Sequence, residues 1–89
     1  MKAIVTVIAR DRVGIIASVA QIMAKNDINI LDMSQTIMQG YFTMIMLVDL
    51  SASAVPFAEV TSILKQAGEE QNMDIRIQRE EVFEAMHRI

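Results

Sequence analysis

Hydrophobic residues change their spacing several times along the chain, and each change predicts a new element. The β-branched run at 2–9 is too short for an unaided helix and predicts a strand. From Val13 the apolar residues recur every three or four positions, which predicts an amphipathic helix that ends near 25–27. The residues of its apolar stripe are Ile15, Val19, Ile22 and Met23.

The middle and end of the chain predict three more strands and two more helices. Strands are expected at 28–38 and 41–50, joined by a tight turn at Gln39 and Gly40, because glycine accepts positive φ. Ser53 is the expected N-cap of a second helix, with Pro56 in its first turn. The segment 73–78 alternates apolar and polar residues as a half-buried strand does. The apolar stripe of the second helix is Phe57, Val60, Leu64 and Ala67, and that of a short carboxyl-terminal helix at about 82–88 is Val82, Phe83, Met86 and Ile89.

The order βαββαβ predicts an α+β fold of one domain, residues 1–89. It is the ferredoxin-like split-βαβ sandwich, with a four-stranded antiparallel sheet and two helices on one face. The strands at 2–9 and 41–50 are apolar on both faces, yet the helices cover only one. We therefore expect the carboxyl-terminal segment and a second copy of the chain to cover the other face, which predicts a homodimer.

Composition narrows the classes of function. No apolar run reaches the roughly 18–20 residues of a membrane span, so a soluble protein is expected. The absence of cysteine excludes disulfides and thiolate chemistry and favours a reducing cytoplasm. The net charge is −3, and most of the acidic residues lie at or after Glu59, which argues against a nucleic-acid partner.

Four segments resemble one known family. They are "DRVGI" after the first strand, "NDINILDMSQT" at the second, "GYFTMIMLVDL" as the third, and the ending "IQREEVFEAMHRI". Together they are similar to ACT domains, the small regulatory modules that bind amino acids, and in particular to the stand-alone single-ACT proteins of bacteria and archaea. The resemblance implies a ligand site at a dimer interface, lined by the loop after the first strand and the start of the second strand. The residues at these positions are Asp11, Arg12, Gly14, Ile15, Asn29 and Ile30.

The chemistry of the same residues suits a zwitterion. A helix amino terminus offers unpaired backbone N–H groups to a carboxylate, and Gly14 allows close approach. Asp11 would pair with an ammonium group, while Asn29, from the same or the partner chain, both donates and accepts. Asp11 has an alternative role as the N-cap of the helix, accepting from Val13 or Gly14. Arg12 would hold a carboxylate or remain solvated.

Two positions depart from the family pattern. Val13 stands where many ACT loops have proline, so the loop is less rigidly preset. Ala9 and Asp11 stand where serine-binding members have His and Asn, so the resemblance does not imply serine specificity.

Catalysis is not expected, and neither is a metal or a cofactor. His87 is the only histidine, and with Glu84 it falls short of the three or four ligands of a metal site. One alternative is an acylphosphatase-like enzyme using Arg10 or Arg12 with Asn29, but its glycine-rich phosphate loop is missing. A protein–protein interaction module without ligand is the other. The favoured hypothesis is a regulatory homodimer that binds an amino acid and acts through a partner protein or a change of assembly.

Overall fold

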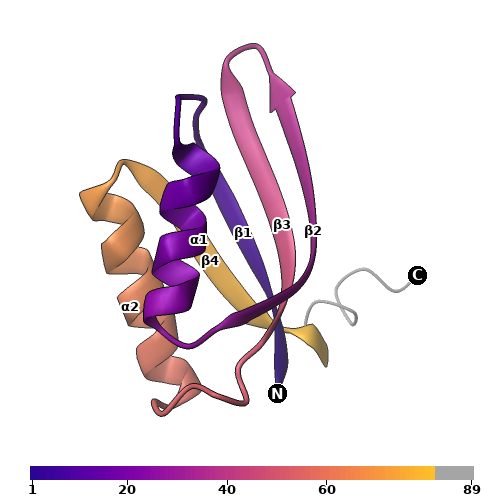
Figure 1. The fold of residues 1–89 in the computed structure, drawn as a ribbon, viewed down its shortest axis with the longest axis vertical. Coiled ribbons are helices and arrows are strands. Elements are labelled where there is room, and N and C mark those ends of the chain that lie inside the picture. The colour runs from indigo at the N-terminus through magenta and orange to yellow at the C-terminus, as the bar shows by residue number, and fades with distance from the viewer. Residues whose placement is uncertain (82–89) are drawn as a thin grey trace.

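The computed structural model describes residues 1–81, which form six elements in the predicted order (Figure 1). The predicted boundaries agree with it to within one or two residues for most elements. The predicted helix at about 82–88 lies outside the described residues, as does His87. The elements are β1 (Lys2–Arg10), α1 (Ile15–Lys25), β2 (Asn29–Met38), β3 (Tyr41–Asp49), α2 (Phe57–Glu70) and β4 (Met73–Arg79).

The four strands form one antiparallel sheet in the order β2-β3-β1-β4. Thr6 at the middle of β1 lies opposite Ile45 of β3 and Arg76 of β4. Both helices lie against the same face of this sheet (Figure 1). The ferredoxin-like prediction is therefore confirmed, with β2 and β4 as the two edge strands.

The core lies between the helices and one face of the sheet. Alternate residues of β1 and β3 point into it, and those of β4 do the same at Met73, Ile75 and Ile77. The stripe predicted for α1 is fully buried, since all four of its residues are in the core. No buried polar or charged side chain is found among residues 1–81, so apolar packing holds this layer together.

The predicted turn at Gln39 and Gly40 and the predicted N-cap at Ser53 have different outcomes. Gln39 and Gly40 both have positive φ, 52° and 81°, which confirms the tight turn and makes it the type I′ hairpin that matches strand twist. The prediction that Ser53 is the N-cap of the second helix is wrong. The N-cap of α2 is Pro56, which makes no side-chain bond, and the Ser53 N–H instead donates to the Leu50 carbonyl at 3.0 Å. Pro56 therefore precedes the first turn in place of lying in it as predicted, and its φ of −62° and ψ of 155° form the extended backbone that is typical of an N-cap.

Neither described helix is long and apolar enough to cross a membrane.

Helix α2 approaches β4 unusually closely at Gly68, which is buried. A Cβ atom there would lie 2.7 Å from the Met73 carbonyl oxygen and 2.9 Å from Cγ1 of Ile75. The missing side chain thus sets the distance between helix and strand.

We expect Gly68→Ala to destabilise the fold. Alanine favours a helix over glycine by about 1 kcal/mol. The contact with backbone at Met73 cannot relax easily, however, and overpacking costs about 1–3 kcal/mol. Denaturant unfolding should show a net loss of stability, whereas Ser62→Ala, on the exposed side of α2, should stay within about 0.5 kcal/mol of wild type. A Gly68→Ala chain at least as stable as wild type would contradict this packing.

Candidate functional site

The loop between β1 and α1 exposes a helix amino terminus. Gly14 is the N-cap of α1, with φ 82°, and no side chain caps the helix. An added Cβ on Gly14 would meet nothing within 4 Å, so the space beside it is open. The left-handed φ explains the glycine, because other residues adopt it only with strain. The first turn of α1 contains no acidic residue, so its partial positive charge is not neutralised from within the helix.

Asp11 does not cap α1, and this alternative from the sequence is wrong. The loop takes three more residues to reach Ile15, the first helical residue, and Gly14 occupies the N-cap position instead. Asp11 is exposed, and its backbone N–H donates to the Gly40 carbonyl at 2.8 Å. Its carboxylate is therefore free of the capping role.

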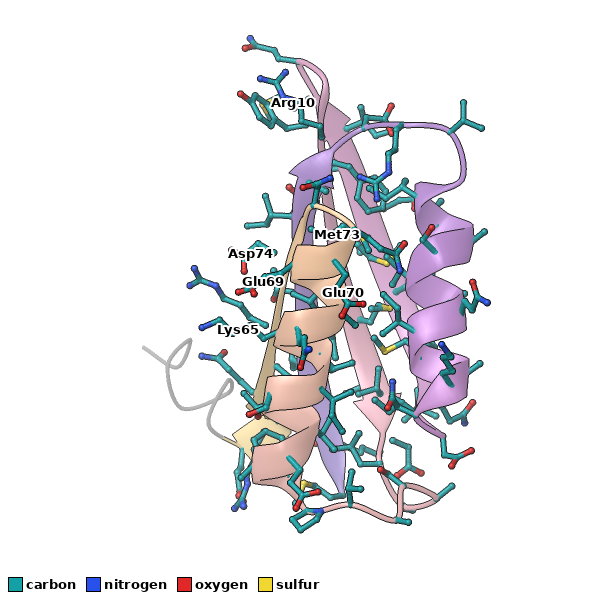
Figure 2. The ribbon with its side chains drawn as sticks, turned by 90° about the vertical axis from the view of Figure 1, so that its left-hand side faces the viewer. Arg10, Lys65, Glu69, Glu70, Met73 and Asp74 are labelled. Carbon is teal, nitrogen blue, oxygen red and sulfur yellow. The ribbon has the colours of Figure 1, made fainter. Side chains whose placement is uncertain are left out.

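Arg12 in the loop and Arg10, the last residue of β1, each contact a neighbouring element. The Arg12 guanidinium donates to the Gln71 carbonyl at 2.7 Å, at the carboxyl end of α2. Such a cation is favourable beside the partial negative charge of a helix end. The Arg10 guanidinium lies 5.0 Å from the centroid of the Tyr41 ring, so it stacks against the start of β3 (Figure 2). The loop is thus joined to both the β2–β3 hairpin and the turn after α2.

The other predicted half of the site lies elsewhere in the same chain. The β1–α1 loop and the β2–β3 hairpin are at one end of the sheet, and β2 begins at the opposite end (Figure 1). There Asn29 pairs with Asp49 in the sheet register. The structure therefore brings together Asp11, Arg12 and Gly14, but it separates Asn29 and Ile30 from them by the length of β2.

The residues at the Asn29 end have their own polar contacts. Asp49 accepts from the Ser51 hydroxyl at 2.6 Å and from the Ser51 N–H at 2.9 Å, and the amino terminus lies 3.8 Å away. The hydroxyl bond, followed by the backbone bond, lowers the pKa of the Asp49 carboxyl from its usual value. Asp49 thus stays ionised beside Asn29.

The two isoleucines belong to the core or border it. Ile15 is buried in the core, and Ile30 is half-buried and packs against it. The chemical groups available at the loop are therefore an exposed carboxylate, an arginine in contact with Gln71, and the N–H groups of a helix amino terminus. Within residues 1–81 no cluster of three metal-binding side chains occurs.

Sequence reasoning missed the contacts that hold the loop in place. Arg12 and Gln71 are 59 positions apart. No periodic pattern in the sequence predicts a contact between two residues so far apart. The sequence did contain a signal for an exposed uncharged surface near α1, because the stretch from Val13 to Ala24 contains no charged residue. Val13, just before α1, and Ile16 within it are both exposed.

Comparisons with known proteins agree with this fold. The profile of the ACT domain family matches residues 2–78. A UPF0237 protein of Clostridium acetobutylicum is 56% identical over 89 residues, with all of each chain covered. Another, from the archaeon Methanocaldococcus jannaschii, is 48% identical over 88 residues, covering 99% of this chain and 98% of its own.

Solved structures show the same likeness. An ACT domain protein from Streptococcus pneumoniae superposes with a TM-score of 0.82 at 39% identity, covering 98% of both chains. A putative glycine cleavage system transcriptional repressor superposes with a TM-score of 0.70 at 23% identity, over 86% of this chain and 44% of its own, which is a likeness of fold alone. Since the family profile spans nearly the whole sheet and both helices, this chain belongs to the ACT domain family.

Proposed function

We propose that this chain is a cytoplasmic regulatory protein that binds a free amino acid between two copies of itself. The observation that carries the proposal is the separation of the two predicted half-sites. The loop with Asp11 and Gly14 lies at one end of the sheet, and Asn29 lies at the other. A site containing both needs a second copy.

The β2 edge is the surface suited to that second copy. Every residue of β2 from Leu31 to Met38 is exposed, including Met33, Ile37 and Met38, the last two at 56% and 66%. A long exposed edge strand offers unpaired backbone groups to another strand, and proteins normally protect such edges. Two copies joined along β2 would cover this edge.

An antiparallel pairing of two β2 strands completes the site. It brings the Asn29 end of each copy to the hairpin end of the other, where the Asp11 loop is tied to Gly40. Two equivalent sites result, related by the two-fold axis. Each contains the α1 amino terminus of one copy and the start of β2 from the other.

The ligand groups follow from the charges. The carboxylate of an amino acid faces the N–H groups at Gly14 and the start of α1, and its ammonium pairs with Asp11. Asn29 and the backbone near Ile30 take the remaining hydrogen bonds. Arg12 holds the loop through Gln71 and adds positive charge beside the carboxylate. The Asp11 carboxylate supports this assignment because no capping bond occupies it.

A thermal-shift screen against the twenty standard amino acids tests the function. A ligand that binds only the folded state, present at about 100 times its Kd, stabilises by about 2.7 kcal/mol. For a domain of this size the melting temperature should rise by roughly 10 °C or more. A flat result with all twenty would instead support an interaction module without ligand.

The β2 interface is tested by Ile37→Lys. A lysine on an edge strand opposes pairing with another strand. Sedimentation equilibrium at micromolar concentration should give twice 10.0 kDa for wild type and 10.0 kDa for the variant. Ala58→Lys, exposed on α2 away from this edge, is the matched control and should remain dimeric. A monomeric wild type, or a dimeric Ile37→Lys, would refute the interface.

Mixing two variants tests whether the site is shared. Asp11→Asn removes a charge-assisted bond of roughly 1.5–3 kcal/mol, so calorimetry should show about tenfold or weaker binding of the amino acid found in the screen. Its melting temperature without ligand should be unchanged, because Asp11 does not cap α1. Asn29→Ala should also weaken binding.

A mixed dimer of the two variants has one intact site, made from the Asp11 loop of one copy and Asn29 of the other. Mixing should therefore restore tight binding at one of the two sites in each mixed dimer. If each site were built within one chain, mixing would restore none. Glu59→Gln is the control for Asp11→Asn, because it also removes one negative charge but lies outside the loop. It should not weaken binding.

A further inference from the structure

The β4 edge of the sheet differs from the β2 edge in its charges. Within residues 1–81, β4 pairs with β1 alone, so its other side is an edge (Figure 1). The apolar residues of β4 point into the core, whereas Asp74 and Arg76 are exposed on the other face of the sheet. A negative and a positive charge thus alternate along this edge strand.

These two charges form an exposed ion pair within the strand. Nη2 of Arg76 lies 3.3 Å from Oδ2 of Asp74, and the two side chains are 76% and 50% exposed. A carboxylate accepts several hydrogen bonds and a guanidinium donates five. Both side chains therefore have capacity for a second partner of opposite charge.

Helix α2 contributes another pair of opposite charges beside the same edge. A groove of about 260 Å³ lies between α2 and β4, lined by Thr61 and Lys65 of the helix and by residues 74–77 of the strand. Glu69 follows Lys65 by about one helical turn. Both side chains point to the side of the molecule on which Asp74 lies (Figure 2).

An antiparallel pairing of two β4 strands is complementary when its two-fold axis lies at Ile75. Residues directly opposite each other in such a pair point to the same face of the sheet. With the axis at Ile75, Asp74 of each copy lies opposite Arg76 of the other. An axis at Asp74 or at Arg76 would instead place two like charges opposite each other, which is destabilising.

The helix layer agrees with the same axis. Gly68 packs on Ile75, since an added Cβ on Gly68 would lie 2.9 Å from Cγ1 of Ile75. An axis at Ile75 therefore crosses α2 near Gly68, between Lys65 and Glu69. Each of these side chains then faces the opposite charge on the second copy.

We propose that the β4 edge is an interface of its own between copies of this chain, formed by antiparallel pairing centred on Ile75. Charged side chains on an edge strand commonly prevent pairing, but the alternation of Asp74 and Arg76 makes this edge complementary to itself. The apolar residues of β4 are already buried, and exposed ion pairs contribute little, so the pairing is weak, with a Kd of about 1 mM. It joins copies at higher concentration than the β2 edge and depends neither on that edge nor on a ligand.

Reversal of single charges tests the proposal. Every variant also carries Ile37→Lys, so that pairing through β2 does not contribute. Sedimentation equilibrium at low salt, from about 10 μM to about 1 mM, should show the 10.0 kDa chain forming dimers at the upper end. Asp74→Arg and Arg76→Asp should each weaken this association about tenfold or more, because like charges then lie opposite each other. Salt at about 1 M, where the Debye length is about 3 Å, should weaken it too.

Two combinations should restore the association. The double variant Asp74→Arg with Arg76→Asp again has opposite charges across the axis. An equimolar mixture of the two single variants pairs a chain that has two positive charges with a chain that has two negative ones. Glu70→Arg, in the groove between α1 and α2, is the matched charge reversal and should associate as its Ile37→Lys parent does.

Three results would overturn the proposal. If the Ile37→Lys chain remains monomeric at about 1 mM, the charges of β4 protect the edge and do not pair it. If association survives both single reversals, it uses another surface. If neither the double variant nor the mixture restores it, Asp74 does not lie opposite Arg76 of a second copy.

Discussion

Two helices can cover only one face of a four-stranded sheet, and this constraint governs the rest of the molecule. β1 and β3, the central strands, are apolar on both faces. Their inward residues form the core with α1 and α2. Their outward residues, together with the exposed β2 edge, leave apolar surface that the described residues do not cover. The proposed second copy would cover the β2 edge.

Most of the fold could be predicted because each element has an uninterrupted pattern. The stripe Ile15, Val19, Ile22 and Met23 has the period of a helix, and all four residues are buried. The alternation in β4 likewise predicts its buried side. The Ser53 cap and the alternative cap role of Asp11 failed for a local reason. Both are residue types that favour caps, but the helices begin further along the chain, after Pro56 and Gly14.

The site was predicted less completely because it depends on register and not on pattern. Asp11, Arg12 and Gly14 are adjacent in sequence, so their grouping in one loop was expected. The position of Asn29 follows from its pairing with Asp49, at the far end of an antiparallel sheet. Only the direction of β2 relative to the loop reveals that Asn29 and Asp11 lie at opposite ends of the sheet within one chain. Arg12 also contacts Gln71, a residue close to it only after the fold has formed.

The bond from the Asp11 N–H to the Gly40 carbonyl has a thermodynamic consequence. Gly40 lies in the hairpin that follows β2, so in the proposed dimer any movement of β2 on pairing would be transmitted to the loop proposed to receive the ligand. Coupling free energy is reciprocal: the factor by which dimerisation raises ligand affinity is the factor by which the ligand raises dimer affinity. Under the proposed function, this small chain would convert the concentration of an amino acid into its own degree of assembly. A partner that distinguishes one copy from two would then respond to the metabolite without contacting it.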